Sequence, residues 1–225
     1  MGWTDVLRFF RGPFFTVSLL IFIGGMAYRL VHALLLGWSR DRVKSRGFKA
    51  VGVVKSYLKG LFILPFIPWV RRTFGRNALT YIAGGLFHLA LFVIIFFGTP
   101  HMLVWKGLLG FGWPTVPAPA IDWLAAVGIV SLAVLLINRL THPVVRLITR
   151  TPDWVNWVLV FLPFVTGFMM THHIGFRYEV LFSLHMMAVD ALLIWIPVGR
   201  ISHFMFYFFS RTFQGAQAGK RAVNP

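Results

Sequence analysis

The sequence predicts an all-α integral membrane protein: a bundle of five transmembrane helices with one amphipathic helix in the membrane interface. Of the 225 residues, 58% are hydrophobic and only 12% are charged, whereas soluble domains carry about 25% charged residues. The mean hydropathy is +0.75. Five apolar stretches each approach the ~20 residues that a helix needs to cross a bilayer. We therefore expect the chain to lie in lipid.

The N-terminal region predicts an amphipathic lead-in over residues 1–12 and a first span over about 14–38. No small-residue cleavage site follows the basic start, so we expect no cleavable signal peptide. Near the end of this span lie Arg29 and His32. Charged groups within a span usually face the protein interior or reach toward the headgroups. Arg29 therefore either extends to the headgroups or holds a negatively charged group of a cofactor.

A basic connection occupies residues 39–76, with ten Lys or Arg and a single acid, Asp41. Its middle, 51–70, is apolar enough for a span, but two lysines interrupt it and two prolines break its end. We interpret it as the interfacial helix, with its basic face outward.

The remaining spans are expected at about 78–98, 123–140, 154–171 and 180–204. A Gly-, Pro- and Trp-rich loop over 106–122 is expected to cap one end of the bundle. Residues 1–213 would then form one membrane domain, and the polar tail, 214–225, would be disordered.

The net charge of +16 would suit a nucleic-acid binder, but its distribution excludes that class. With five spans, one side of the membrane carries seventeen Lys or Arg in its loops and tail, and the other carries four. Basic loops stay in the cytoplasm. The asymmetry predicts a multi-pass protein of a bacterial or archaeal cytoplasmic membrane, with its N-terminus outside and its C-terminus in the cytoplasm.

Two histidines in the last apolar stretch, His185 and His203, are 18 residues apart. In one continuous helix this is about five turns, so both would project from one face, roughly 27 Å apart. That distance is close to the thickness of the hydrocarbon core. The pair suits two haems stacked across a membrane, although two unrelated helix-end histidines would show the same spacing.

The topology also predicts which histidines can pair. His88 lies early in the second span and His203 late in the fifth, so both lie in the cytoplasmic half and can face one another. His185 lies near the outer surface. His101 is its first candidate partner, and His172 or His173 is the alternative. Because the chain has no cysteine, disulfides, thiolate-bound iron–sulfur clusters and cysteine catalysis are excluded. A redox centre here needs histidine or methionine ligands.

Four further residues are candidates for a quinone site. Asp190 is the one carboxylate well inside a span, where burial is costly without a partner or a role. It would accept a proton, support a haem or make a structural hydrogen bond. Lys106, His172 and His173 lie at the outer surface, where a quinol would release protons, or are solvated surface residues.

The segments Leu86-Phe87-His88 and Leu184-His185, then Pro197, Arg200 and Ile201-Ser202-His203, together with Arg29, carry a family resemblance. The chain resembles the gamma subunit of respiratory nitrate reductase, a five-span dihaem cytochrome b. It is similar also to the membrane cytochromes of sulfite-reduction-associated and heterodisulfide-reductase-like complexes. The resemblance extends over about residues 14–211. It implies bis-histidine haem b, one or two per chain. The family also has an arginine near the end of span one, and for Arg29 the cofactor group to hold would be a haem propionate.

One position departs from that pattern. The nitrate reductase subunit has a second histidine about ten residues after the first on span two, and here that position is Gly98. The nearest histidine is His101, past Pro100, on a different face from His88 unless the proline redirects the chain. The inner haem, on His88 and His203, is therefore the better supported one. The outer haem is expected on His101 and His185, unless it is absent or uses a different partner.

The expected function is electron transfer between membrane quinone and a cytoplasmic iron–sulfur or catalytic subunit, docked on the basic connection and tail. With no cysteine in this chain, the next redox centre would lie on that subunit. The alternative is a haem-free transporter or assembly protein whose histidines line a path for metal ions or protons.

Overall fold

The computed structural model describes residues 2–36, 44–60, 75 and 77–223. The regular structure of these residues is helical. Five of the helical stretches are long and apolar enough to cross a membrane: Trp3–Leu35, Ala78–Phe97, Ala118–Thr141, Thr151–Thr171 and Tyr178–Trp195. The expectation of an all-α protein with five candidate spans is confirmed at this level.

The chain forms two compact units, each described by itself. Unit 1 comprises Met1–Ile21 and Ala78–Trp195, and unit 2 comprises Phe22–Asn77 and Ile196–Pro225. The sequence predicted one domain over 1–213. The division falls inside the first long helix and at the end of the fifth span, where the backbone leaves helical geometry.

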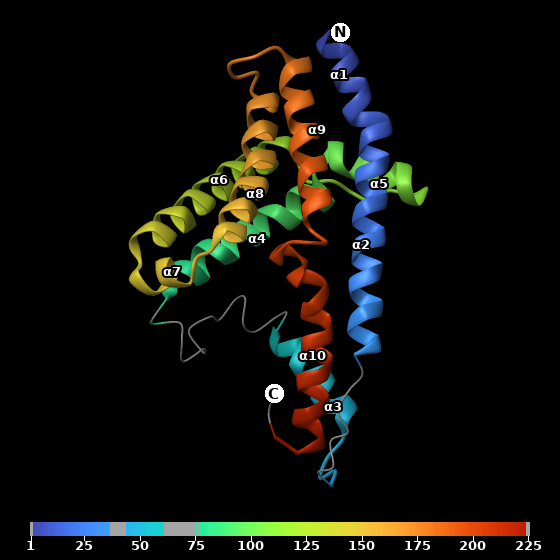
Figure 1. Cartoon of the computed structure of the whole chain (residues 1–225), viewed down its shortest axis with the longest axis vertical. Helices are drawn as coiled ribbons and strands as arrows, with labels where there is room; N and C mark the ends of the chain where they lie inside the picture. The colour runs from blue at the N-terminus through green and yellow to red at the C-terminus, as the bar shows by residue number, and fades with distance from the viewer. Residues whose placement is uncertain (1, 37–43, 61–74, 76, 224–225) are drawn as a thin grey trace. The chain divides into compact units, whose positions relative to one another are not determined.

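The N-terminal segment is helical from Trp3 to Leu35. It consists of α1 (Trp3–Phe9), a π-helical turn η1 (Phe10–Phe14) and α2 (Phe15–Leu35) (Figure 1). Pro13 lies inside the π turn. Proline has no backbone N–H for the i−4 bond, and a local widening accommodates this defect without ending the helix. The expected lead-in and first span therefore form one continuous stretch.

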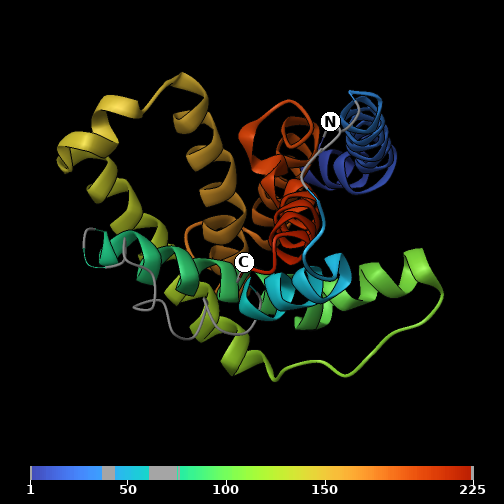
Figure 2. The same ribbon diagram turned by 90° about the horizontal axis from the view of Figure 1, so that it is seen from below.

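Unit 1 is completed by six helices. These are α4 (Ala78–Phe97), α5 (Thr99–Leu109), α6 (Ala118–Thr141), α7 (Pro143–Ile148), α8 (Thr151–Thr171) and α9 (Tyr178–Trp195). Helix α4 packs along α6, and α8 packs against both α6 and α9 (Figures 1 and 2). Helix α1 and η1 pack against α9. The buried core centres on Phe87, Ala90, Leu132 and Phe164.

The expected loop over 106–122 is shorter than predicted, because α5 continues to Leu109. Pro100 lies in the first turn of α5, where the helix needs no N–H donor. Gly110, with φ of 81°, ends the helix in the left-handed conformation that glycine adopts without strain. Of the expected loop, only residues 110–117 lie outside helices.

Unit 2 contains α2 from Phe22 onward, α3 (Lys49–Leu58), the 3₁₀ turn η5 (Arg200–Ser202) and α10 (His203–Lys220). Helix α3 packs along α10. Glycines allow the close approach: a Cβ on Gly215 would lie 2.7 Å from the Gly52 carbonyl oxygen. Helix α3 is the described part of the expected interfacial helix 51–70, and residues 61–70 lie outside the described residues.

Two expectations for the C-terminal region are wrong. The fifth span was expected to run from 180 to 204, but α9 ends at Trp195 and α10 begins at His203. Pro197 lies in the break, where it cannot continue a helix. His185 and His203 therefore do not share a face of one helix. The tail expected to be disordered is helical through Lys220, because its glycines pack on α3.

Candidate functional site

Two histidines from different helices of unit 1 lie side by side. His101 comes from α5 and His185 from α9, and their ring centroids are 6.3 Å apart with an angle of 61° between the ring planes. His101 was the first of the three partners that the sequence offered for His185, and it is the one that makes this contact.

The chain turns sharply just before His101. Helix α4 ends at Phe97, Gly98 is extended (φ −71°, ψ 131°), and α5 begins at Thr99 with Pro100 in its first turn. A Cβ on Gly98 would lie 2.6 Å from the Ile94 carbonyl oxygen and 3.3 Å from His101 Nδ1. A residue with a side chain at position 98 would therefore push against both groups. The break at Gly98 separates His101 from α4, and His101 contacts His185 from α5.

The Thr166 hydroxyl on α8 fixes the tautomer of His185. Its oxygen lies 3.1 Å from His185 Nδ1 and donates its own proton to the Leu162 carbonyl at 2.7 Å. Because the Thr166 hydroxyl proton is donated to Leu162, the Thr166 oxygen acts as an acceptor for the His185 Nδ1–H. His185 Nε2 then carries the lone pair, and a metal binds the nitrogen that carries the lone pair. Gly167 leaves room for the ring, since a Cβ there would lie 3.2 Å from His185 Cε1.

The separation of the two rings suits one metal held between them. Metal–imidazole bonds are about 2.0–2.1 Å long. The ring centre lies roughly 1 Å beyond the bonding nitrogen, so imidazoles on opposite sides of one metal have centres about 6 Å apart. His101 Nδ1 is buried and makes no hydrogen bond of good geometry with a described residue. The Ile94 carbonyl is the polar group that acts on this ring, so the observation that fits a shared metal is the spacing of the two rings.

Burial lowers the pKa of His101, more than the neighbouring Ile94 carbonyl raises it. The ring is therefore neutral at neutral pH, as a ligand must be. Among the described residues, no three His, Cys, Asp or Glu side chains cluster as metal ligands. A haem needs only two axial protein ligands, because the porphyrin supplies four nitrogens.

His88 and His203, expected to form the inner pair, belong to different units. His88 Nδ1 lies 2.6 Å from the Gly84 carbonyl in unit 1, which makes Nδ1 the protonated nitrogen and directs the lone pair to Nε2. Phe87 packs edge-on against its ring. In unit 2, His203 is the exposed first residue of α10, with Nδ1 3.4 Å from the Arg200 carbonyl.

Arg29 binds the break between α9 and α10. Its Nη1 donates to the carbonyls of Pro197 and Gly199 at 2.9 and 3.0 Å and to Ser202 Oγ at 2.6 Å. The carbonyls at a helix break have no intrahelical partner, and Arg29 supplies one. This contact accounts for a charged side chain within the first candidate span.

The four candidate quinone residues have separate surroundings. The Asp190 side chain is fully buried, and its oxygens make no hydrogen bond of good geometry with any residue that the structure describes; the Ser18 hydroxyl lies beside it. His172 Nε2 lies 3.9 Å from an Asp122 oxygen. His173 packs near Tyr178, and Lys106 is exposed on α5.

One comparison with known proteins gives a relative. A protein of Nitratidesulfovibrio vulgaris (strain Hildenborough), described only as "Protein", is 30% identical over 207 residues, covering 90% of this chain and 89% of the relative. The chain belongs to that protein's family. No model of a protein family matches the sequence. No solved structure matches it either.

Sequence reasoning found both members of the histidine pair but missed the residues that position them. Thr166 precedes His185 by 19 residues and lies on another helix, so no local pattern couples them. Gly98 is the position at which the sequence departs from the nitrate reductase pattern. Its function, making space for His101, depends on the turn between α4 and α5.

Proposed function

We propose that the chain is the membrane cytochrome b subunit of a respiratory redox complex, which transfers electrons between membrane quinone and a partner iron–sulfur or catalytic subunit. The observation that carries the proposal is the contact between His101 and His185, with ring centroids 6.3 Å apart and one tautomer fixed by Thr166.

The residues of this site would hold, orient and insulate an outer haem b. His101 and His185 would supply the axial nitrogens, and Thr166 would keep His185 in its metal-binding tautomer. When bound, the iron supplies one-electron redox chemistry, whereas the surrounding helices supply a dry, low-dielectric setting.

A second, inner haem b stays a prediction of the sequence, which pairs His88 with His203. The Gly84 carbonyl accepts a hydrogen bond from His88 Nδ1 and so leaves Nε2 free to bind a metal, as Thr166 does for His185. His203 follows directly after Ser202, which Arg29 binds, so Arg29 would orient the start of α10 and with it the axial ligand.

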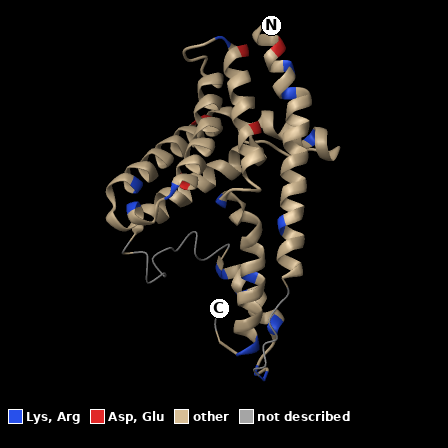
Figure 3. Cartoon of the chain, viewed as in Figure 1, with Lys and Arg blue, Asp and Glu red and all other residues tan. Residues whose placement is uncertain are grey.

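The partner subunit would dock on unit 2, whose described residues carry ten Lys or Arg and no Asp or Glu. Basic residues occur along α3 and α10 (Figure 3). Such a face attracts an acidic partner and sets its orientation. The seventeen-to-four charge asymmetry supports a cytoplasmic location for this face.

The deciding experiment is the reduced-minus-oxidised optical spectrum and haem content of the purified full-length protein. We expect a b-type α band and one or two haems per chain. His185→Ala should remove the outer haem, and His172→Ala, at an exposed histidine of the same unit, should leave it in place. A folded, colourless protein would overturn the proposal and favour the transporter alternative.

A further inference from the structure

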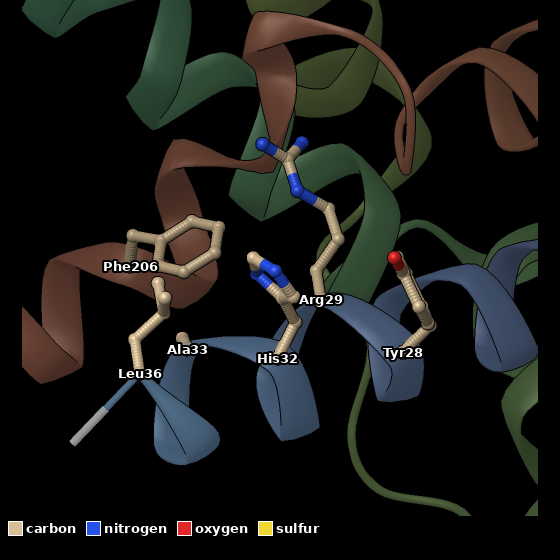
Figure 4. Close-up of a pocket in the computed structure, with 6 residues that line it drawn as sticks. All are labelled: Tyr28, Arg29, His32, Ala33, Leu36 and Phe206. Atoms are coloured by element: carbon tan, nitrogen blue, oxygen red, sulfur yellow. The ribbon is translucent and has the colours of Figure 1, made fainter.

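Unit 2 has a pocket of about 270 Å³ between α2 and α10, lined by Tyr28, Arg29, His32, Ala33, Leu36 and Phe206 (Figure 4). All six residues belong to this one unit. Sites for drug-sized ligands run from about 300 to 1,000 Å³, so this pocket suits a group of one or two fused rings and is too small for a macrocycle.

The walls of the pocket are flat and aromatic. Tyr28 and His32 stack with ring centroids 6.0 Å apart and planes 26° from parallel. Figure 4 shows the His32 ring pointing from α2 toward the side on which Phe206 lies. Ala33 and Leu36 complete the lining with aliphatic surface. Aromatic walls favour a planar ring as ligand, because aromatic rings pack on one another in offset-stacked or edge-to-face arrangements.

Polar groups at the pocket can donate hydrogen bonds to such a ring. No described residue accepts a hydrogen bond from the Tyr28 hydroxyl or from a ring nitrogen of His32. The Arg29 guanidinium lies 5.3 Å from the Phe206 ring centroid, and the three described groups that accept hydrogen bonds from it are uncharged. The described part of unit 2 contains no carboxylate to neutralise it.

The pocket opens to the side. Tyr28 is 70% exposed and Leu36 is 74% exposed. Tyr28 lies in the candidate span Trp3–Leu35, so its exposed side would meet lipid. The aromatic pocket and its opening toward lipid both suit a ligand whose head enters the pocket and whose apolar tail stays in the membrane.

We propose that this pocket binds the headgroup of a membrane quinone, with Tyr28 and His32 as donors to its carbonyl oxygens and Phe206 against its ring. A phosphate group fits less well, since it needs several converging N–H donors and Arg29 Nη1 already serves three acceptors. The inference rests on the proposed function and deepens it: Phe206 lies three residues after His203 on α10, one helical turn from the proposed inner axial ligand.

The test measures binding of tail-free 2,3-dimethyl-1,4-naphthoquinone to the full-length protein in phosphatidylcholine nanodiscs, by calorimetry. His32→Phe and Tyr28→Phe keep the rings and remove the donors, and Phe206→Leu removes the stacking face. Each should weaken binding about tenfold or more, as expected for one lost hydrogen bond or stacking contact. The haem spectrum should not change.

The matched controls are His173→Phe and Tyr178→Phe, the aromatic pair of unit 1 with centroids 6.2 Å apart. They should bind the probe like the unmodified protein. If the controls weaken binding and the pocket variants do not, the quinone site lies at the outer surface and the inference is wrong. A haem-containing protein that does not bind the probe also overturns it.

Two further outcomes separate the possible failures. If inorganic phosphate displaces the probe and its own affinity falls in the pocket variants, the pocket is an anion site and the inference fails. If the protein contains no haem but the pocket variants still lose the probe, the proposed function fails and the quinone site stands.

Discussion

The rings of His101 and His185 lie 6.3 Å apart between centroids, although 84 positions separate the two residues in the sequence. Two ligands of one iron act as a unit, so their losses are not additive. His101→Ala and His185→Ala should each remove the same haem, and the double variant should lose nothing more. Haem content per chain measures this. Additive losses would show that the two side chains serve different sites.

Thr166 should tune the same haem without touching it. Thr166→Val removes the acceptor for His185 Nδ1–H and keeps the shape of the side chain. A hydrogen bond at that position makes the imidazole more electron-donating and stabilises ferric iron, so its loss should raise the midpoint potential of the outer haem. Haem affinity should fall about 10–100-fold.

The control for this prediction is Thr166→Ser, which retains the hydroxyl and should retain both the potential and the affinity. Redox titration followed optically, with haem retention during gel filtration, measures both quantities. Equal behaviour of the valine and serine variants would mean that the contact with His185 has no influence on the iron.

Gly98 should tolerate no side chain. Gly98→Ala places a Cβ 2.6 Å from the Ile94 carbonyl oxygen and 3.3 Å from His101 Nδ1, so the turn into α5 must shift and move His101. We expect loss of the outer haem with the inner haem retained. Gly107→Ala on α5 is the control, because nothing lies within 4 Å of its Cβ. Alanine in a helix is favoured over glycine by about 1 kcal/mol, so this variant should retain both haems.

The candidate spans were predictable from sequence because each depends on local properties of length and hydropathy. The second span, expected at about 78–98, is α4 (Ala78–Phe97). The break after Trp195 was not anticipated, although Pro197 marks it, because the apolar run continues past the proline. What stabilises that break is Arg29, about 170 residues earlier in the chain, and no local pattern reports such a contact.

The helical tail shows the same limit. Its Gly- and Ala-rich composition indicated disorder, because it offers little apolar side-chain surface to bury. Gly215 and Gly219 instead let α10 approach the backbone of Gly52 on α3. Small residues stabilise a helix only when a partner helix is close. That partner lies over 150 residues away in the sequence, beyond any window of composition.

The basic residues of unit 2 should hold the partner subunit through electrostatic attraction. Lys44, Lys49 and Lys55 are exposed and lie outside the five candidate spans. Reversing all three to Glu should release the partner subunit, because the attraction of an acidic surface becomes repulsion. The haem spectrum should be unchanged, since none of the three side chains is near a proposed axial ligand in the sequence. Co-purification at low and moderate ionic strength measures retention of the partner.

Three exposed basic residues of unit 1, Arg8, Lys106 and Arg177, provide the matched control for this charge reversal. Changing them to Glu alters the net charge by the same amount, yet the partner should remain bound. In the unmodified protein, retention should weaken as salt rises, since exposed charges are screened beyond about 8–10 Å at physiological ionic strength. If the partner survives reversal in unit 2, or is lost equally from the unit 1 variant, the basic residues of unit 2 do not form its docking face. Their excess would then serve only to set membrane orientation.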